Sequence, residues 1–153
     1  MLEIFTVAKQ KMRAAGNMNQ WEEGYPSSED LENDIRRGFS YVIEDDGRII
    51  STFVLAICPD PTYARIYDGA WLDDETEYGT IHRIASLDGY HGLMAKVLGF
   101  SFSKVRNIRI DTHKDNLPMR HLMKKYSFTY CGIIHLADNR GERLAYQKII
   151  INQ

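Results

Sequence analysis

The segment 78–128 reads YGTIHRIASLDGYHGLMAKVLGFSFSKVRNIRIDTHKDNLPMRHLMKKYSF, and its pattern switches repeatedly between β type and helix type. Residues 78–86 are rich in strand-forming types and end before the turn pair Asp88-Gly89. A helical apolar stripe then begins after Gly92 and contains Leu93, Met94, Val97 and Leu98. The predicted unit is strand, glycine-bearing turn, helix, strand and helix. Such a turn directs free backbone N–H groups and the positive end of a helix at one point, which favours an anion such as phosphate.

The second half of this segment carries the sharper motif. Residues 108–116 read IRIDTHKDN and are followed by Pro118-Met119 and by KYSF at 125–128. Together with the glycine-bearing turn, this resembles the GCN5-related N-acetyltransferase (GNAT) family, from about Trp21 to Lys148. The resemblance implies an α/β (α+β) fold. Its twisted sheet would be mixed and mostly antiparallel, with a splayed parallel pair of central strands and flanking helices.

The same resemblance implies how acetyl-CoA would be held. The pantetheine arm would pair with the main chain of Ile84, Ala85 and Ser86 and meet Asn116, while the pyrophosphate would lie on the turn formed by Gly89, Tyr90, His91, Gly92, Leu93 and Met94. The chain departs from the family pattern at two places. Of the usual Gln/Arg-x-x-Gly-x-Gly/Ala loop only Gly92 is in register, and Met123 stands where many members have a tyrosine that protonates the leaving thiolate.

Transfer of acetyl to an amine by direct attack needs a proton acceptor, and histidine as a residue type suits this role near neutral pH. We expect the catalytic residues to be His82 in the strand 81–86, His113 after the strand 108–112, and Tyr126. Strand alternation predicts that Ile81, Arg83 and Ala85 share one face and that His82, Ile84 and Ser86 share the other. The alternative for each histidine is a structural role, and Tyr126 could belong to the core.

The acceptor side of the predicted site draws on separate parts of the chain. Trp21 and Tyr25 lie in a loop that, in the resembling family, lines the acceptor pocket, and both could instead cover the core. We add Asp111 and Cys131 as substrate-binding candidates. Asp111 lies two residues before His113 and could alternatively form a surface ion pair with Arg109. Cys131 could equally be a packed strand cysteine.

Other periodic segments complete the predicted fold. A first helix carries Phe5, Ala8, Met12 and Ala15 on one face, and a second begins near Ser27 with Leu31, Ile35 and Phe39 on its apolar side. Two hairpins are expected, one joining 41–44 to 49–56 and one joining 129–136 to 143–150 through the turn 138–141. Residues 66–72 are expected to extend the sheet. No strand is expected before the first helix, so an open sheet edge would favour pairing with another chain, and a homodimer is the expected partner arrangement.

Composition and sequence patterns indicate the number of domains, the classes of partner and the location of the protein. The 153 residues, 44% hydrophobic and 26% charged, suit one domain spanning 1–153. A net charge of −2 and an isoelectric point near 6.2 favour neither nucleic acid nor an anionic membrane as a partner. The apolar runs are too short to span a bilayer and the N-terminus is helical rather than signal-like, so a cytoplasmic protein is expected. No histidine or cysteine spacing indicates a metal, and Cys58 and Cys131 are expected to be reduced.

The sequence therefore predicts an N-acetyltransferase that moves acetyl from acetyl-CoA to the primary amine of a small molecule or peptide. A non-catalytic acyl-CoA-binding or regulatory domain on the same fold is the main alternative, because the glycine loop is degenerate and the tyrosine is missing. A plain oligomeric interaction protein is a third possibility.

Overall fold

The computed structural model describes residues 1–18, 20–21, 24–136 and 141–151. Four helices and six strands follow one another in the order α1 (Leu2–Ala14), α2 (Ser28–Arg36), β1 (Ser40–Asp45), β2 (Arg48–Ala56), β3 (Gly79–Ser86), α3 (Leu93–Lys104), β4 (Asn107–Thr112), α4 (Leu117–Lys125), β5 (Thr129–His135) and β6 (Glu142–Ile149). A short 3₁₀ turn, η1 (Pro61–Tyr63), lies between β2 and β3. The predicted turn residues 138–140 fall outside the described part of the chain.

The strands form one sheet in the order β1-β2-β3-β4-β6-β5, in which β3 and β4 are the parallel pair and the other neighbours are antiparallel. This is the predicted mixed sheet. Within the described residues no strand precedes α1, and β1 forms one edge of the sheet. The homodimer expected from that open edge stays a prediction.

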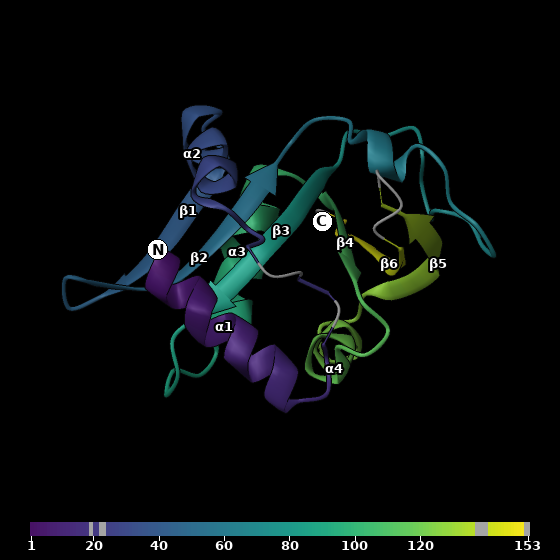
Figure 1. Ribbon diagram of the computed structural model, residues 1–153. Helices are drawn as coiled ribbons and strands as arrows, with labels where there is room; N and C mark the ends of the chain where they lie inside the picture. Colours follow the sequence, from purple (N-terminus) through teal and green to yellow (C-terminus); the bar gives the residue numbers. More distant parts are fainter. Residues whose placement is uncertain (19, 22–23, 137–140, 152–153) are drawn as a thin grey trace.

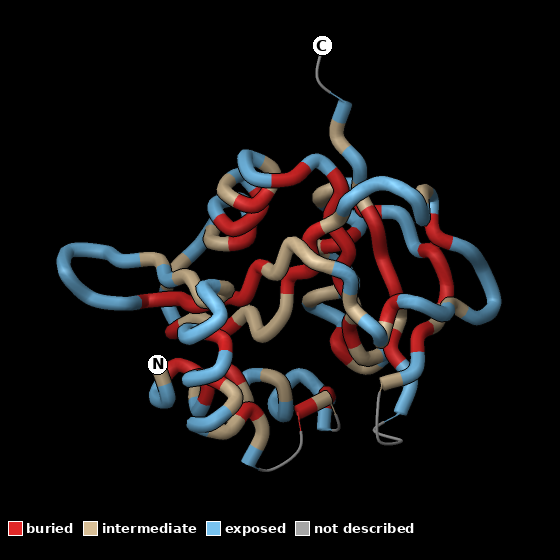
Figure 2. Tube along the Cα trace, turned by 90° about the horizontal axis from the view of Figure 1, so that it is seen from above, coloured by how far each residue is buried: buried red, intermediate tan, exposed pale blue. Residues whose placement is uncertain are grey.

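Helices cover both faces of the sheet, with α1 crossing in front of β2 and β3 and α3 lying behind (Figure 1). On the α1 side, Ile4, Phe5 and Leu31 pack with Ala85 and Leu87. On the α3 side, a larger cluster joins that helix and Met123 of α4 to β2, β3 and β4. Buried residues therefore follow the central strands, while loops and outer helix faces are exposed (Figure 2).

Local sequence explains where α2 begins and where the first hairpin turns. Ser27 and Asp30 form a capping box, in which each side chain accepts a hydrogen bond from the other residue's backbone N–H. Asp46 and Gly47 both have positive φ angles, of 50° and 79°, as the tight hairpin turn between β1 and β2 requires. Of the apolar side chains expected on α2, Leu31 is buried, whereas Ile35 is 56% exposed and does not pack as predicted.

A β-bulge in β3 overturns the predicted alternation of its side chains. His82 pairs with Val54 and Ala85 pairs with Thr52, so Arg83 and Ile84 together oppose one residue of β2. Arg83 has a φ of 50°, which turns the strand there. In consequence Ile81 packs on the α3 side and Ala85 on the α1 side, although simple alternation places them on one face.

The parallel pair separates soon after it forms. The register of β3 with β4 contains only Gly79 with Ile108 and Thr80 with Arg109, although β3 continues for six more residues. The two strands lie together at their N-terminal ends and diverge toward their C-terminal ends (Figure 1). The predicted splay is therefore present.

The segment 66–72 is not a strand, contrary to prediction. Its pairing with the sheet is limited to an isolated bridge between Tyr67 and Ile133. Gly69 lies so close to β5 that a Cβ atom there would be 1.9 Å from the carbonyl oxygen of Cys131. The backbone N–H of Ala70 also donates to the Cys131 oxygen, so the segment lies along the outer edge of β5, and Trp71 is buried against Tyr63.

Replacing Met123 tests the core beneath α4. Its side chain is 0% exposed and lies in the cluster shared by α3 and the central strands. We expect Met123→Ala to lower the free energy of unfolding by about 2–5 kcal/mol, because it leaves a cavity. The matched control is Met18→Ala, which alters a side chain 58% exposed and should change the value by less than about 0.5 kcal/mol. Equal denaturation midpoints for the two variants would contradict this packing.

Candidate active site

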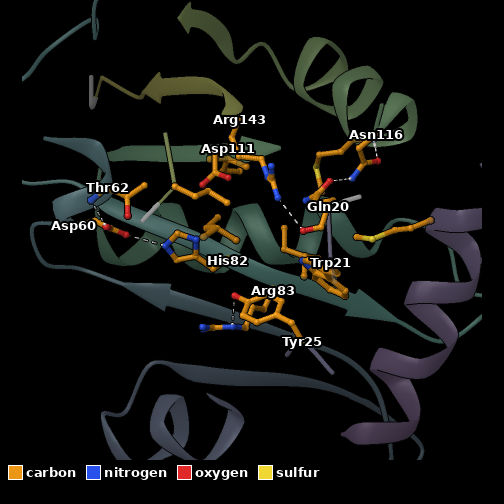
Figure 3. Close-up of a pocket in the computed structure, with 16 residues that line it drawn as sticks. Gln20, Trp21, Tyr25, Asp60, Thr62, His82, Arg83, Asp111, Asn116 and Arg143 are labelled. Atoms are coloured by element: carbon orange, nitrogen blue, oxygen red, sulfur yellow. Dashed lines mark hydrogen bonds and ion pairs between the residues drawn. The ribbon is translucent and has the colours of Figure 1, made fainter. Parts of the chain in front are cut away.

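Two hollows meet where β3 and β4 diverge. The first, called here the polar cavity, has a volume of about 230 Å³ and lies between β3, β4, the loop after α1 and η1 (Figure 3). The second, called here the groove, has a volume of about 420 Å³ and runs from the N-terminus of α3 along β3 and α4. Met12, Ile84, Asn116 and Met119 line both hollows. The opening between the strands thus connects a polar compartment to a longer and more apolar one.

The groove gathers most of the residues predicted to bind the cofactor. Ile84, Ala85 and Ser86 line it from β3, and Tyr90, His91, Gly92, Leu93 and Met94 line it from the turn. Gly89 lies outside the groove but has a φ of 86°, and Gly92 has a φ of 72° at the N-cap of α3. Among the described residues no side chain caps α3, so its first N–H groups are available to an anion. Met94 stays compatible with the turn because its side chain packs into the core beside Val97.

Asn116 and Gln20 close the junction between the two hollows. The Asn116 Oδ1 caps α4 by accepting the N–H of Met119, and its Nδ2 donates to Gln20 Oε1 at 2.9 Å. Gln20 Oε1 also accepts hydrogen bonds from Asn17, Thr112 and the backbone N–H of His113. One amide oxygen therefore ties the loop after α1 to the end of β4 and the start of α4.

His82 faces Asp60 across the polar cavity, with its Nε2 atom 3.3 Å from the carboxylate Oδ2 (Figure 3). Asp60 Oδ1 accepts the backbone N–H of Thr62. Burial alone would raise the pKa of Asp60, but the hydrogen bonds from His82 and Thr62 outweigh it and hold that pKa below its ordinary value. The carboxylate is therefore ionised near neutral pH and can accept a hydrogen bond from the Nε2–H of His82.

Asp111 also lines the polar cavity, but its partner differs from both predicted ones. The hydroxyl of Tyr63 donates to Asp111 Oδ2 at 2.5 Å. Burial, reinforced by Asp111, raises the pKa of Tyr63 well above its ordinary value, so that this phenol stays protonated. The alternative surface ion pair with Arg109 is wrong, because Arg109 is 1% exposed and bonds to Asp74. Its guanidinium lies between two aromatic rings, 4.1 Å from that of Trp71 and 3.8 Å from that of Tyr78.

The other predicted residues divide between the hollows and the core. Trp21 and Tyr25 line the polar cavity, and Tyr126 lines the groove. His113 lies outside both linings, and its Nδ1 accepts the backbone N–H of Asp115. Burial and the nearby Arg143 lower the pKa of His113. Cys131 also lies outside both linings and is packed with Tyr63 and Trp71, where burial raises the pKa of its thiol. These two residues are thus not brought to the opening.

Sequence reasoning missed Gln20, Asp60 and Arg143, all of which line the polar cavity. Gln20 and Arg143 meet through a hydrogen bond from Arg143 Nη2 to the Gln20 backbone oxygen at 2.9 Å. Asp60 lies between two prolines. This pattern indicates a turn but does not predict which residues Asp60 contacts in the folded chain. Asp60 meets His82 across 22 positions and Gln20 meets Arg143 across 123 positions of the sequence, so periodicity carries no signal for these contacts.

The described ranges contain neither a candidate metal cluster nor a candidate membrane-spanning helix. There, no group of three or more histidine, cysteine, aspartate or glutamate side chains is placed to hold a metal ion. In the same ranges, none of the helices has both the length and the apolar character needed to cross a membrane.

The hydrogen bonds of Gln20 provide a stability test. Gln20→Leu removes the acceptor of four donors, of which those on Asn17, Thr112 and Asn116 belong to buried residues. We expect a loss of about 2 kcal/mol or more in the free energy of unfolding, because buried donors are left without a partner.

The matched control is Gln20→Glu, which keeps the acceptor oxygen and should cost less than about 1 kcal/mol. Urea denaturation of both variants measures the difference. An equal loss for leucine and glutamate would show that the shared oxygen is not what holds the loop.

Comparison with known proteins relates this geometry to a family. No family model matches the sequence, and none of the curated proteins matches it. Among solved structures, a GNAT-family acetyltransferase of Streptococcus agalactiae is similar at 33% identity and a TM-score of 0.87, covering 99% of this chain and 88% of that one.

Two further solved structures share the fold at lower identity. A putative acetyltransferase of Staphylococcus aureus is 23% identical with a TM-score of 0.68, covering 97% of this chain and 89% of its own. A Bacillus subtilis acetyltransferase in complex with CoA is 13% identical with a TM-score of 0.61, covering 99% and 93%. The extent and identity of the Streptococcus agalactiae match establish that this chain belongs to the GNAT family of acetyltransferases.

Proposed function

We propose that the protein transfers the acetyl group of acetyl-CoA to the primary amine of a small molecule or of a peptide. The observation that carries the proposal is the separation of β3 from β4 after two register pairs, with the groove and the polar cavity meeting at the opening. A thioester in that opening would have its cofactor on one side and an amine on the other. Family membership supports acyl transfer as the reaction class.

The groove supports acetyl-CoA as the donor. Within the described part of the chain, the edge of β3 that faces β4 has no strand partner beyond Thr80, so an extended pantetheine arm could add to it as a strand would. The uncapped N-terminus of α3 lies at the other end of the groove and suits the pyrophosphate. The Bacillus subtilis protein, which shares this fold, is itself a complex with CoA.

The polar cavity supports an amine as the acceptor. Asp60 and Asp111 line it, and carboxylates attract an ammonium group before it loses its proton. Trp21 and Tyr25 add apolar surface on which the carbon skeleton of the acceptor can lie. A volume of about 230 Å³ is below the usual range for drug-sized ligands, which favours a small amine or one end of a peptide.

In the proposed reaction the amine nitrogen attacks the carbonyl carbon of the thioester, the new C–N bond forms, and the C–S bond breaks to release the CoA thiolate. His82 accepts the proton that the amine gives up, with Asp60 holding the imidazole in place. Tyr126 lines the groove and is the candidate proton donor to the thiolate, since Met123 is fully buried and has no acidic proton. The main chain of the bulge at Arg83 and Ile84 lies beside the opening, where it could donate a hydrogen bond to the thioester oxygen.

Removing His82 tests the proposed base. We expect His82→Ala to lower kcat by about 10²–10⁴-fold, as the loss of a general base typically does, when CoA thiol release is followed with a panel of primary amines. The matched control is His121→Ala, which alters an exposed histidine of α4 outside both hollows and should keep wild-type kcat.

Equal kcat values for His82→Ala and wild type would remove His82 from the mechanism. Acetyl-CoA binding by the wild-type protein without thiol release for any amine would favour the non-catalytic acyl-CoA-binding alternative, which the buried Met123 keeps open.

Blocking the junction tests where acetyl-CoA lies. Wild-type protein should melt at a higher temperature when acetyl-CoA is present, by an amount that grows with the ratio of its concentration to its Kd. Met119 lines both hollows, so Met119→Trp should abolish most of this shift by filling the space. Arg120→Trp places the same ring on the exposed side of α4 and should keep the shift. A full shift in Met119→Trp would place the cofactor elsewhere.

A further inference from the structure

The bulge that shapes the opening is built around a residue in an uncommon backbone conformation. Arg83 has a φ of 50°, a value that residues with side chains rarely adopt, and it follows His82 directly in β3. Such conformations persist where surrounding contacts hold them, and they concentrate at functional sites. The contacts that hold Arg83 therefore bear on the position of His82.

One of those contacts comes from the lining of the polar cavity, and the other comes from α2, outside both hollows. Arg83 Nη1 donates to Asp34 Oδ2 of α2 at 2.6 Å, a short charge-assisted bond. Arg83 Nε donates to the hydroxyl of Tyr25 at 3.2 Å, and its guanidinium lies 5.5 Å from the centre of that ring. Asp34 is only 8% exposed, and it lines neither the polar cavity nor the groove.

The charge of Asp34 is costly at this place unless Arg83 is present. Burial raises the pKa of Asp34, and the attraction and hydrogen bond of Arg83 oppose that rise. If Asp34 only packed against the sheet, an apolar side chain could take its place and avoid the cost of burying a charge. The pairing thus fixes the guanidinium, and through it the left-handed backbone at Arg83.

We infer that Asp34 is a positioning residue for the transfer reaction: by fixing Arg83 it maintains the bulge of β3 and with it the orientation of His82 toward Asp60. The inference rests on the function proposed above. Asp34 touches neither substrate nor cofactor in this scheme, and it influences turnover only by its contact with Arg83.

Steady-state kinetics of Asp34→Asn, a nearly isosteric variant without the charge, provide the test. We expect kcat to fall by about 10–100-fold, the scale of a small misplacement of a catalytic group, while KM for acetyl-CoA changes by less than about threefold, since no groove residue is altered. The double variant Asp34→Asn/Arg83→Gln should be no slower than Arg83→Gln alone, because both changes break one contact.

The matched control is Asp30→Ala, which removes the capping box of the same helix but leaves the Arg83 contact. It should lower the melting temperature and keep wild-type kcat. If Asp34→Asn only lowers the melting temperature as this control does, or if its effect adds to that of Arg83→Gln, the inference is overturned.

Two further readouts keep the test decisive. Should Asp34→Asn fail to fold, Arg83→Gln provides the test instead. A lower kcat with an unchanged KM for acetyl-CoA supports the inference, and a wild-type kcat overturns it.

Amide hydrogen exchange separates this inference from the proposed function. Faster exchange at residues 82–85 in Asp34→Asn, and not in Asp30→Ala, shows that Asp34 holds the bulge. With that result, absence of turnover in the wild-type protein would count against the proposed function alone.

Discussion

The separation of β3 from β4 is the constraint on which the rest of the structure depends. Neighbouring strands normally satisfy their backbone groups by pairing along their whole length, and unpaired groups are costly when they are buried away from water. Here the pair ends after Thr80 and Arg109, so the freed edge of β3 needs another partner. The groove along Ile84 to Ser86 is where that partner can lie. An extended cofactor arm would supply hydrogen bonds that the protein itself leaves unmade.

Keeping the strands apart requires structure on both sides of the opening. On the α3 side, Ile81, Ile108, Ile110 and Met123 form a continuous apolar layer that holds the two diverging strands against the same helices. On the opposite side polar contacts accompany the packing of α1, since Asp60 meets His82, Tyr63 meets Asp111, and Asp34 meets Arg83. The apolar layer thus fixes the strands, whereas the polar contacts fix the side chains that face the cavity.

The two loops that complete the polar cavity are held by side-chain hydrogen bonds. The loop after α1 is tied down through the amide oxygen of Gln20. The segment between β2 and β3 is tied down by the indole of Trp71, which donates to the Tyr63 backbone oxygen, and by Tyr78, whose hydroxyl accepts the N–H of Asp60. Since loops carry few apolar contacts of their own, such hydrogen bonds decide where the functional side chains come to rest.

The sequence by itself determined the parts of this protein that depend on local periodicity and turn chemistry. The hairpin at Asp46-Gly47, the capped helix after Ser27 and the glycine turn before α3 all follow from residues close together in the chain. The parallel pair on either side of α3 was expected from the resemblance of the sequence to the GNAT family. His82 could be singled out because histidine as a residue type suits proton transfer near neutral pH and its strand was expected to border the opening. Tertiary structure alone decided which residues meet it. One extra residue at Arg83 reverses the sheet face of everything that follows, and Asp60, Gln20 and Asp34 reach the site across long stretches of chain. Alternation assumes an unbroken ladder, and no local pattern records a bulge that is held in place by a carboxylate on a distant helix.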